Sequence, residues 1–239
     1  MNLLSWHRFD ALLRGTLPPA ERVRLLGIWT LWQVLAAAIF GASLGVFSLT
    51  ARAVPDARFL AASAGKLPLL LLLTTTVTLP SLYVFGTLRG LRFRAREFLA
   101  ILMVAHTLFA AVLASLGPII AFFALTTSSY SFMVLLTVAA CALGGGIGVR
   151  VFVRTINQPP ALPIAELPEQ PPELREPSAS TWQLLGWWVV LYMFVGAQSG
   201  WILRPFIGSP DEPFVLFRGK VGGFTAATLH HLWVVMTGG

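Results

Sequence analysis

The side chain best suited to acid–base chemistry in this sequence is His106, which precedes Thr107 deep inside a long apolar run. An ionisable group at the depth of a membrane span is a functional candidate by default. Proton relays and metal sites need partners at matching depth, however, and no carboxylate lies inside any of the long apolar runs. A neutral histidine that hydrogen-bonds to a threonine or carbonyl of a neighbouring helix costs little. We favour this structural role for His106 and keep a functional role as the alternative.

A run of hydroxyl side chains in another apolar stretch suggests a second kind of chemistry. The run contains Thr74, Thr75, Thr76 and Thr78, and it is followed by Pro80 and Ser81. Hydroxyls beside a proline that frees a backbone carbonyl can line a polar path through a membrane. The same hydroxyls can instead bond to their own helix and to adjacent helices, and we favour that interpretation.

Motifs of catalytic or metal chemistry give little support for an enzyme. His230 and His231 are adjacent, so on a helix they point about 100 degrees apart and cannot form the i, i+4 pair of a metal site. No phosphate-binding glycine loop or HExxH motif is present. Cys141 is most simply a small buried apolar side chain, and only as a nucleophile with His106 as its base would it define an intramembrane enzyme. We therefore expect no enzymatic activity and no metal site, and the sequence identifies no cofactor.

These candidates lie in a chain with the composition of a membrane protein. Hydrophobic residues make up 56% of the 239 residues and charged residues 11%, whereas soluble domains carry about 25% charged residues. Uncharged stretches of about 20 residues have the length that a helix needs to cross a hydrocarbon core. The net charge of +7 comes from arginines at the ends of the apolar runs, which is a topology signal. We expect contact with membrane lipid and no nucleic-acid partner.

Five apolar runs predict an all-α, polytopic membrane helix bundle with about five transmembrane helices. The runs cover residues 25–49, 67–88, 98–125, 132–149 and 182–203. Gly117 and Pro118 predict a kink or an interfacial end in the third run, and the charge-free turn 126–131 makes the third and fourth runs a tight hairpin. Surface helices are expected at both ends, because 2–14 is amphipathic but too polar to span and 224–236 is too short.

The distribution of lysine and arginine predicts the orientation of the chain. Of these 17 residues, eleven lie at the amino terminus, after the second run or around the linker, and six lie on the other side. The positive-inside rule then places the amino terminus in the cytoplasm. The predicted parts are a cytoplasmic amphipathic segment (1–24), a four-span bundle (25–154), a proline-rich cytoplasmic linker (155–181), a fifth span (182–203) and a non-cytoplasmic tail with a short apolar helix (204–239).

Small residues spaced four apart indicate where helices approach closely. The pairs are Gly41 and Gly45, Gly144 and Gly148, and Gly196 and Gly200. The pattern does not decide whether these contacts lie within one chain or between chains. Gln33 and Gln198, in the first and fifth runs, are candidates for interhelical hydrogen bonds, including a bond to each other.

The segment after the fifth run combines charges with aromatic anchors. Its candidate interface residues are Arg204, Phe206, Asp211, Phe214, Phe217 and Arg218. Prolines at 205, 210 and 213 exclude a continuing helix. The segment either docks across the outer ends of the helices, which we favour, or presents a rigid patch to another protein. Arg204 can pair with Asp211 or with a lipid phosphate.

The sequence from Trp201 through Arg-Pro-Phe-Ile-Gly-Ser-Pro to Arg218 resembles a family of bacterial polytopic membrane proteins that end their last span with a similar segment and a short apolar tail helix. The likeness extends to 79–85 and to the turn 126–132. It implies a multi-pass protein of the bacterial inner membrane, and it implies no particular activity. The five-span layout with a cytoplasmic amino terminus is also similar to the Yip family of membrane-trafficking proteins, in architecture alone.

These observations favour a non-enzymatic integral membrane protein, a structural or assembly component that packs against other membrane proteins or against copies of itself. Its basis is the set of glycine faces together with the lack of paired charges inside the runs. The alternative is a small transporter or channel that uses the threonine segment and His106, although no inverted repeat is detected. The sequence names no substrate, pigment or partner.

Overall fold

The computed structural model describes residues 11, 17–52, 55–88, 93–158, 179–208, 214–217 and 224–237. Its helices are α2 (Pro19–Arg24), α3 (Leu26–Gly45), α4 (Phe47–Thr50), α5 (Ala57–Leu88), α6 (Ala95–Thr126), α7 (Tyr130–Ile156), α8 (Ala179–Leu203) and α9 (Phe224–Thr237). The described residues contain no strand, so the predicted all-α class is confirmed. The expected surface helix 2–14 lies outside the described residues except for Ala11.

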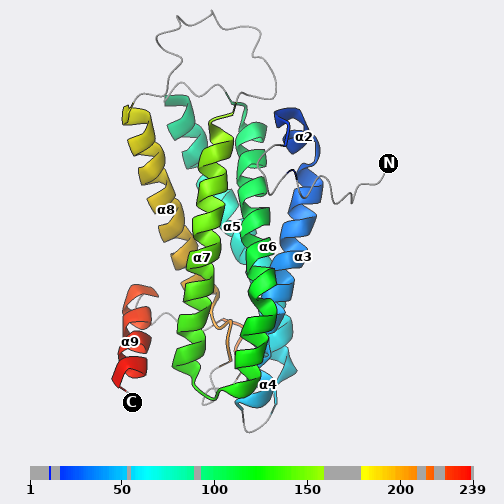
Figure 1. The fold of residues 1–239 in the computed structure, drawn as a ribbon, viewed down its shortest axis with the longest axis vertical. Coiled ribbons are helices and arrows are strands. Elements are labelled where there is room, and N and C mark those ends of the chain that lie inside the picture. Colours follow the sequence, from blue (N-terminus) through cyan, green and yellow to red (C-terminus); the bar gives the residue numbers. More distant parts are fainter. Residues whose placement is uncertain are drawn as a thin grey trace, which may run out of the picture.

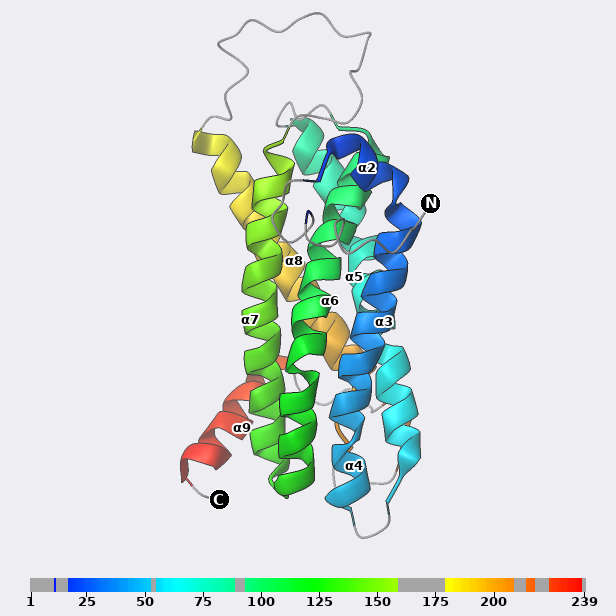
Figure 2. The ribbon, with the colours of Figure 1, turned by 45° about the vertical axis from the view of Figure 1, so that its right-hand side comes forward.

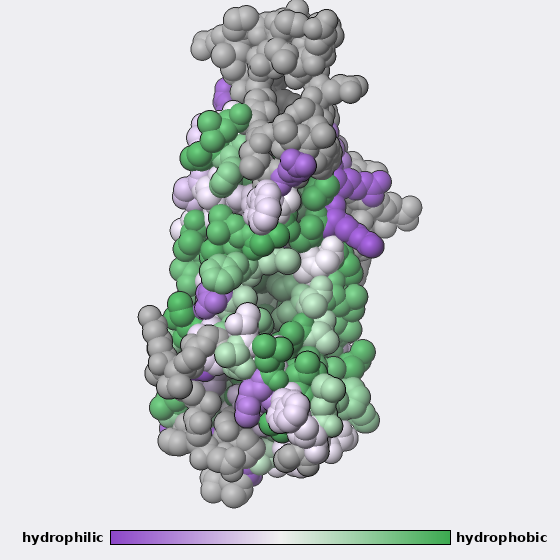
Figure 3. All heavy atoms as spheres, turned by 90° about the vertical axis from the view of Figure 1, so that its left-hand side faces the viewer, coloured by the Kyte–Doolittle hydropathy of each residue, from purple (hydrophilic) through white to green (hydrophobic). Residues whose placement is uncertain are grey.

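Five helices are long and apolar enough to cross a membrane, which confirms the predicted number of spans. They are Leu26–Thr50, formed by α3 and α4, and then Ala57–Leu88, Ala95–Thr126, Tyr130–Ile156 and Leu185–Leu203. They stand side by side, with α2 at one end of the bundle and α4 and α9 at the other (Figures 1 and 2). Side chains over the middle of the face in Figure 3 are mainly hydrophobic, as contact with lipid requires.

The packing order places α5 and α6 at the centre. α3 packs against both of them, α7 packs against α6, and α8 packs against α5. The largest apolar cluster joins α3 and α4 to α6, with Phe40, Phe47, Leu113 and Ile120 almost fully buried. Pro118 lies inside the continuous helix α6 rather than at its end. The predicted hairpin forms, since α6 ends at Thr126 and α7 begins at Tyr130.

The three glycine pairs all mark contacts within the chain. A Cβ atom at Gly41 or Gly45 would overlap the α5 backbone, at the Ser63 carbonyl oxygen and at Leu60 Cα respectively. These two glycines therefore let the backbones of α3 and α5 touch. Gly144 and Gly148 face Phe109 of α6, while Gly196 and Gly200 face the side chains of Thr74 and Leu70 on α5. The question that the sequence left open is answered for the described residues.

The second span begins at Ala57 rather than at residue 67, which corrects the sequence prediction. The Asp56 carboxylate accepts the Arg58 backbone N–H at 3.0 Å and so caps the first turn of α5. Lys66, which we assigned to an outer loop, lies inside the helix and is buried. The assignment was wrong because the partners of Lys66 lie 139 and 150 residues later in the chain, where no local pattern can reveal them.

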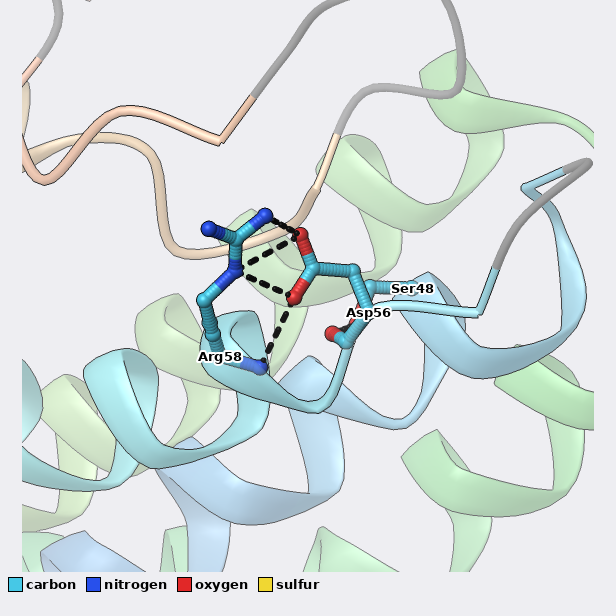
Figure 4. A network of polar contacts seen from close by, with 3 residues as sticks. All are labelled: Ser48, Asp56 and Arg58. Carbon is cyan, nitrogen blue, oxygen red and sulfur yellow. Dashed lines mark hydrogen bonds and ion pairs between the residues drawn. The ribbon is translucent and has the colours of Figure 1, made fainter.

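Polar contacts fasten α4 to the start of α5 (Figure 4). Ser48 Oγ lies 3.0 Å from the carbonyl oxygen of Asp56. The carboxylate of Asp56 forms an ion pair of 2.8 Å with Arg58, and this guanidinium lowers the pKa of Asp56, chiefly through the side-chain hydrogen bond. The pair is exposed to solvent, so it orients the turn more than it stabilises the fold.

Candidate functional site

The strongest candidate site is a hydrogen-bonded network centred on His106 and buried between three spans. His106 lies on α6 with 3% of its surface exposed. Its Nδ1 lies 2.8 Å from the Thr75 hydroxyl oxygen on α5, and its Nε2 hydrogen-bonds to the Tyr192 hydroxyl on α8. Of the residues singled out in the sequence, His106 and Thr75 are therefore brought together.

One assignment of protons turns every contact of this network into a hydrogen bond. The Thr75 hydroxyl lies 2.8 Å from the Leu71 carbonyl oxygen, to which it can donate its single proton. It then accepts from His106 Nδ1–H, which leaves Nε2 of the neutral imidazole as the acceptor for the Tyr192 hydroxyl. The opposite tautomer would leave both the Leu71 contact and the Tyr192 proton without a partner among the described residues. Tyr192, His106 and Thr75 thus form one directed chain.

An aromatic column continues from this network toward the end of the bundle where α2 lies. The ring of Tyr192 stacks on Trp188 at 5.4 Å and 30°, and Trp188 stacks on Phe152 of α7 at 5.1 Å and 27°. Trp188 Nε1 donates to Ser81 Oγ at 3.1 Å, and the Ser81 hydroxyl donates to the Thr78 carbonyl oxygen at 2.7 Å. Buried polar atoms at both ends of the column are therefore satisfied.

Sequence analysis missed Tyr192 and Trp188 as members of the site. The signal was present, because the two residues are four apart and so share one face of the fifth span. A phenol at that depth needs a hydrogen-bond partner, and His106 was the available acceptor. The long linker between the fourth and fifth spans hid which helix would deliver it.

The threonine run is used mainly within its own helix. Each hydroxyl lies 2.7–2.9 Å from the carbonyl oxygen four residues earlier, for Thr74, Thr75, Thr76 and Thr78. Thr107 connects two helices instead, since its hydroxyl lies 3.0 Å from the Trp29 carbonyl oxygen on α3 and 2.7 Å from the Met103 carbonyl oxygen on α6. Only Thr75 and Thr107 therefore link spans through these hydroxyl groups.

The two glutamines do not bond to each other. Gln33 is fully buried on α3, and neither atom of its amide has a hydrogen-bond partner among the described residues. Gln198 lies half-buried on α8. The expected bond is absent because α3 packs against α5 and α6, whereas α8 packs against the other side of the bundle through α5.

The tail residues dock on the first half of α5. Lys66 Nζ donates to the carbonyl oxygen of Pro205 at 3.0 Å and to that of Leu216. Ser63 Oγ donates to the Phe206 carbonyl oxygen. These bonds fasten both described pieces of the tail, 204–208 and 214–217, to one helix.

Aromatic and cationic side chains complete the docking of the tail. Phe214 packs edge-on against Phe59 at 4.9 Å, and Phe217 lies under the ammonium of Lys66 at 5.3 Å. The guanidinium of Arg204 lies 3.6 Å above the ring of Trp201. Asp211 and Arg218 lie outside the described residues, so the proposed pair between Arg204 and Asp211 stays a prediction.

The last helix, α9, packs against α7 near the outer turn. His231 Nδ1 lies 3.0 Å from Ser131 Oγ, and its ring lies edge-on to Tyr130 at 5.5 Å. Burial, with a smaller contribution from the neighbouring His230, lowers the pKa of His231. The described residues contain no group of three or more His, Cys, Asp or Glu side chains that could hold a metal ion.

Two nucleophile arrangements lack the geometry that catalysis requires. Gly41 to Gly45 has the Gly-x-Ser-x-Gly spacing of a nucleophile elbow, which the sequence analysis passed over, but it lies inside α3 rather than in a strand-to-helix turn. The hydroxyl of its Ser43 donates to the Ile39 carbonyl oxygen at 3.0 Å. Both ring nitrogens of His106 are occupied by Thr75 and Tyr192, so His106 offers no free nitrogen to Cys141 as a base.

The chain matches no family model, no curated protein and no solved structure. The family resemblance read from the segment 201–218 therefore stays a prediction, and the candidate site rests on its own geometry.

Proposed function

We propose that this chain is a non-enzymatic integral membrane protein, a structural or assembly component that packs against another membrane protein through the outer face of α7. Ala139, Ala142 and Gly146 are exposed on that face at helical spacing. A Cβ atom added at Gly146 would meet nothing within 4 Å among the described residues. Ala142 and Gly146 thus form a small-residue pair, four apart, that a partner helix can approach closely.

The use of the other small and polar residues supports this choice of face. The three predicted glycine pairs are occupied by the chain's own helices, so they lend no support to an external contact. The His106 network is also internal, with every hydrogen bond satisfied inside the bundle. Transport has less support, because the threonine hydroxyls of α5 are donated to backbone carbonyls instead of lining an open path.

Replacing Gly146 with leucine is expected to abolish co-purification of the partner with the chain. A leucine side chain at this position holds a neighbouring helix away from the α7 backbone. The measurement is native mass spectrometry of the complex extracted into nanodiscs. Gly186→Leu is the matched control, because Gly186 is an exposed glycine on α8 with nothing within 4 Å of its Cβ position.

The two variants separate the outcomes of this experiment. Retention of the partner by Gly186→Leu and its loss from Gly146→Leu support the proposal. A chain that is monomeric and alone before any substitution contradicts it. A complex of two copies that Gly146→Leu dissociates would identify the partner as the chain itself.

The proposed location is the inner membrane of a bacterium, with the amino terminus in the cytoplasm. The supporting observation is the arginine distribution within the described residues. At the α2 end lie Arg22, Arg24, Arg94, Arg96, Arg150 and Arg154, and toward the other end lie Arg52, Arg58, Lys66 and Arg204. Cytoplasmic ends of membrane proteins carry the larger number of positive charges.

Cysteine labelling in spheroplasts tests this orientation. In a chain with Cys141→Ala, we expect Ser128→Cys to react with a membrane-impermeant maleimide and Asn157→Cys to react only after lysis. Ser128 is exposed in the turn between α6 and α7, and Asn157 is exposed directly after α7 at the opposite end. The reverse labelling pattern would invert the orientation.

A further inference from the structure

The His106 network and the aromatic column meet at one residue, Tyr192. Its hydroxyl donates to His106 Nε2, and its ring stacks on Trp188. We infer that Tyr192 is a redox-active tyrosine, which is oxidised by one electron through Trp188 while its hydroxyl proton passes to His106. This activity is independent of the proposed packing on α7.

The first requirement is a base that can take the phenolic proton. A phenol that loses an electron becomes a strong acid, and a charged radical is costly to hold in an apolar interior. His106 Nε2 is the acceptor in an existing hydrogen bond, so the proton moves along that bond without rearrangement. The imidazolium that forms keeps both N–H groups satisfied, because Nδ1–H is already directed at the Thr75 hydroxyl.

The second requirement is a route for the electron. The rings of Trp188 and Tyr192 overlap at 5.4 Å, and Phe152 extends the stack into the last turns of α7. Trp188 Nε1–H is held by the Ser81 hydroxyl, whose own proton is donated to the Thr78 carbonyl oxygen. A neutral hydroxyl is not a base, so oxidised Trp188 keeps its proton and remains a strongly oxidising radical cation. Tyr192, with its imidazole acceptor, is the adjacent electron donor.

The step balances in atoms, electrons and charge. A one-electron oxidant takes one electron from Trp188, and the Trp188 radical cation then takes one electron from Tyr192. The O–H bond of Tyr192 breaks, and its proton forms an N–H bond at His106 Nε2. The products are the reduced oxidant, neutral Trp188, a neutral tyrosyl radical and the His106 imidazolium, and return of an electron reverses both transfers.

Packing alone would not require this combination of residues. A serine or threonine hydroxyl could donate to His106 and satisfy it as well as a phenol does. Here the donor is a phenol that is stacked on an indole, while the indole N–H is held by a group that cannot remove its proton. The proton acceptor and the electron route thus lie on opposite sides of the same ring system.

The test uses the full chain in nanodiscs, with photogenerated ruthenium(III) tris-bipyridine as the one-electron oxidant and electron paramagnetic resonance as the readout. The chain has three tyrosines, so Tyr83→Phe with Tyr130→Phe leaves Tyr192 as the single tyrosine and does not alter the network. This background is expected to give a tyrosyl signal. Trp188→Phe, which keeps a stacked ring, is expected to slow the appearance of that signal.

The decisive variant in this background is His106→Gln. Glutamine can still accept the Tyr192 hydrogen bond through its amide oxygen, but it is not a base. We expect the tyrosyl signal to be lost and a tryptophan radical to persist in its place. Absence of a tyrosyl signal from the background chain, or an undiminished signal after His106→Gln, would overturn the inference.

A second measurement covers the case in which His106→Gln does not fold, as judged by thermal unfolding. In the background chain alone, formation of the tyrosyl radical is expected to be slower in D₂O than in H₂O, because the transferred particle is an exchangeable proton. Equal rates in the two solvents would show that the proton does not move with the electron and would overturn the assignment of His106.

Discussion

Gly41→Ala is expected to lower the free energy of unfolding by about 3 kcal/mol. The added methyl group would overlap the carbonyl oxygen and carbonyl carbon of Ser63, which are backbone atoms and cannot rotate away. The α3 and α5 backbones must separate to make room, and their packing along the whole contact is then lost. Unfolding by an SDS titration in mixed micelles measures the change.

The matched control for this prediction lies on the same helix. Gly27→Ala places the same methyl group on α3, where nothing lies within 4 Å of the new Cβ atom, so its stability is expected to stay equal or rise. Equal unfolding curves for Gly41→Ala and Gly27→Ala would contradict the close approach of α3 and α5.

Lys66→Glu is expected to destabilise the fold by about 4 kcal/mol, the scale of an uncompensated buried charge. The substitution replaces a buried donor with a carboxylate that faces the carbonyl oxygens of Pro205 and Leu216. Those oxygens lose their donor and are repelled by the new charge. The tail is then expected to leave α5, which limited proteolysis measures together with SDS unfolding.

The control for Lys66→Glu is the same charge reversal at an exposed site. Arg96 is exposed in the first turn of α6, where a negative charge also agrees with the helix dipole. Arg96→Glu is expected to change stability by less than about 0.5 kcal/mol. If Lys66→Glu proves as mild as Arg96→Glu, the docking of the tail on Lys66 is wrong.

Features with a strong local signal could be predicted from the sequence. The five apolar runs became five membrane-length helices, because spanning a membrane is decided by the length and composition of one segment. Glycines four apart marked real contact faces for the same reason, since a bare backbone is a local property. Their partners, α5 for Gly41 and Gly196 and α6 for Gly144, followed from the fold alone.

Features that depend on residues far apart in the chain were missed. His106 was recognised as unusual, but Tyr192 is 86 residues away and reaches it only because α8 packs beside α5. Lys66 was placed in a loop because a charge ends an apolar run, and its carbonyl partners follow it by 139 and 150 residues. A single sequence carries no record of which distant groups satisfy a buried charge.

The docking of the tail on Lys66 has a consequence for the order in which the protein is made. When α5 leaves the ribosome, neither Pro205 nor Leu216, whose carbonyl oxygens hold the ammonium, has been synthesised. A lone charge is strongly disfavoured in hydrocarbon, so the nascent helix keeps Lys66 at the membrane surface. Translation of the tail then supplies the carbonyl oxygens, and the first turns of α5 reach their final depth only near the end of synthesis.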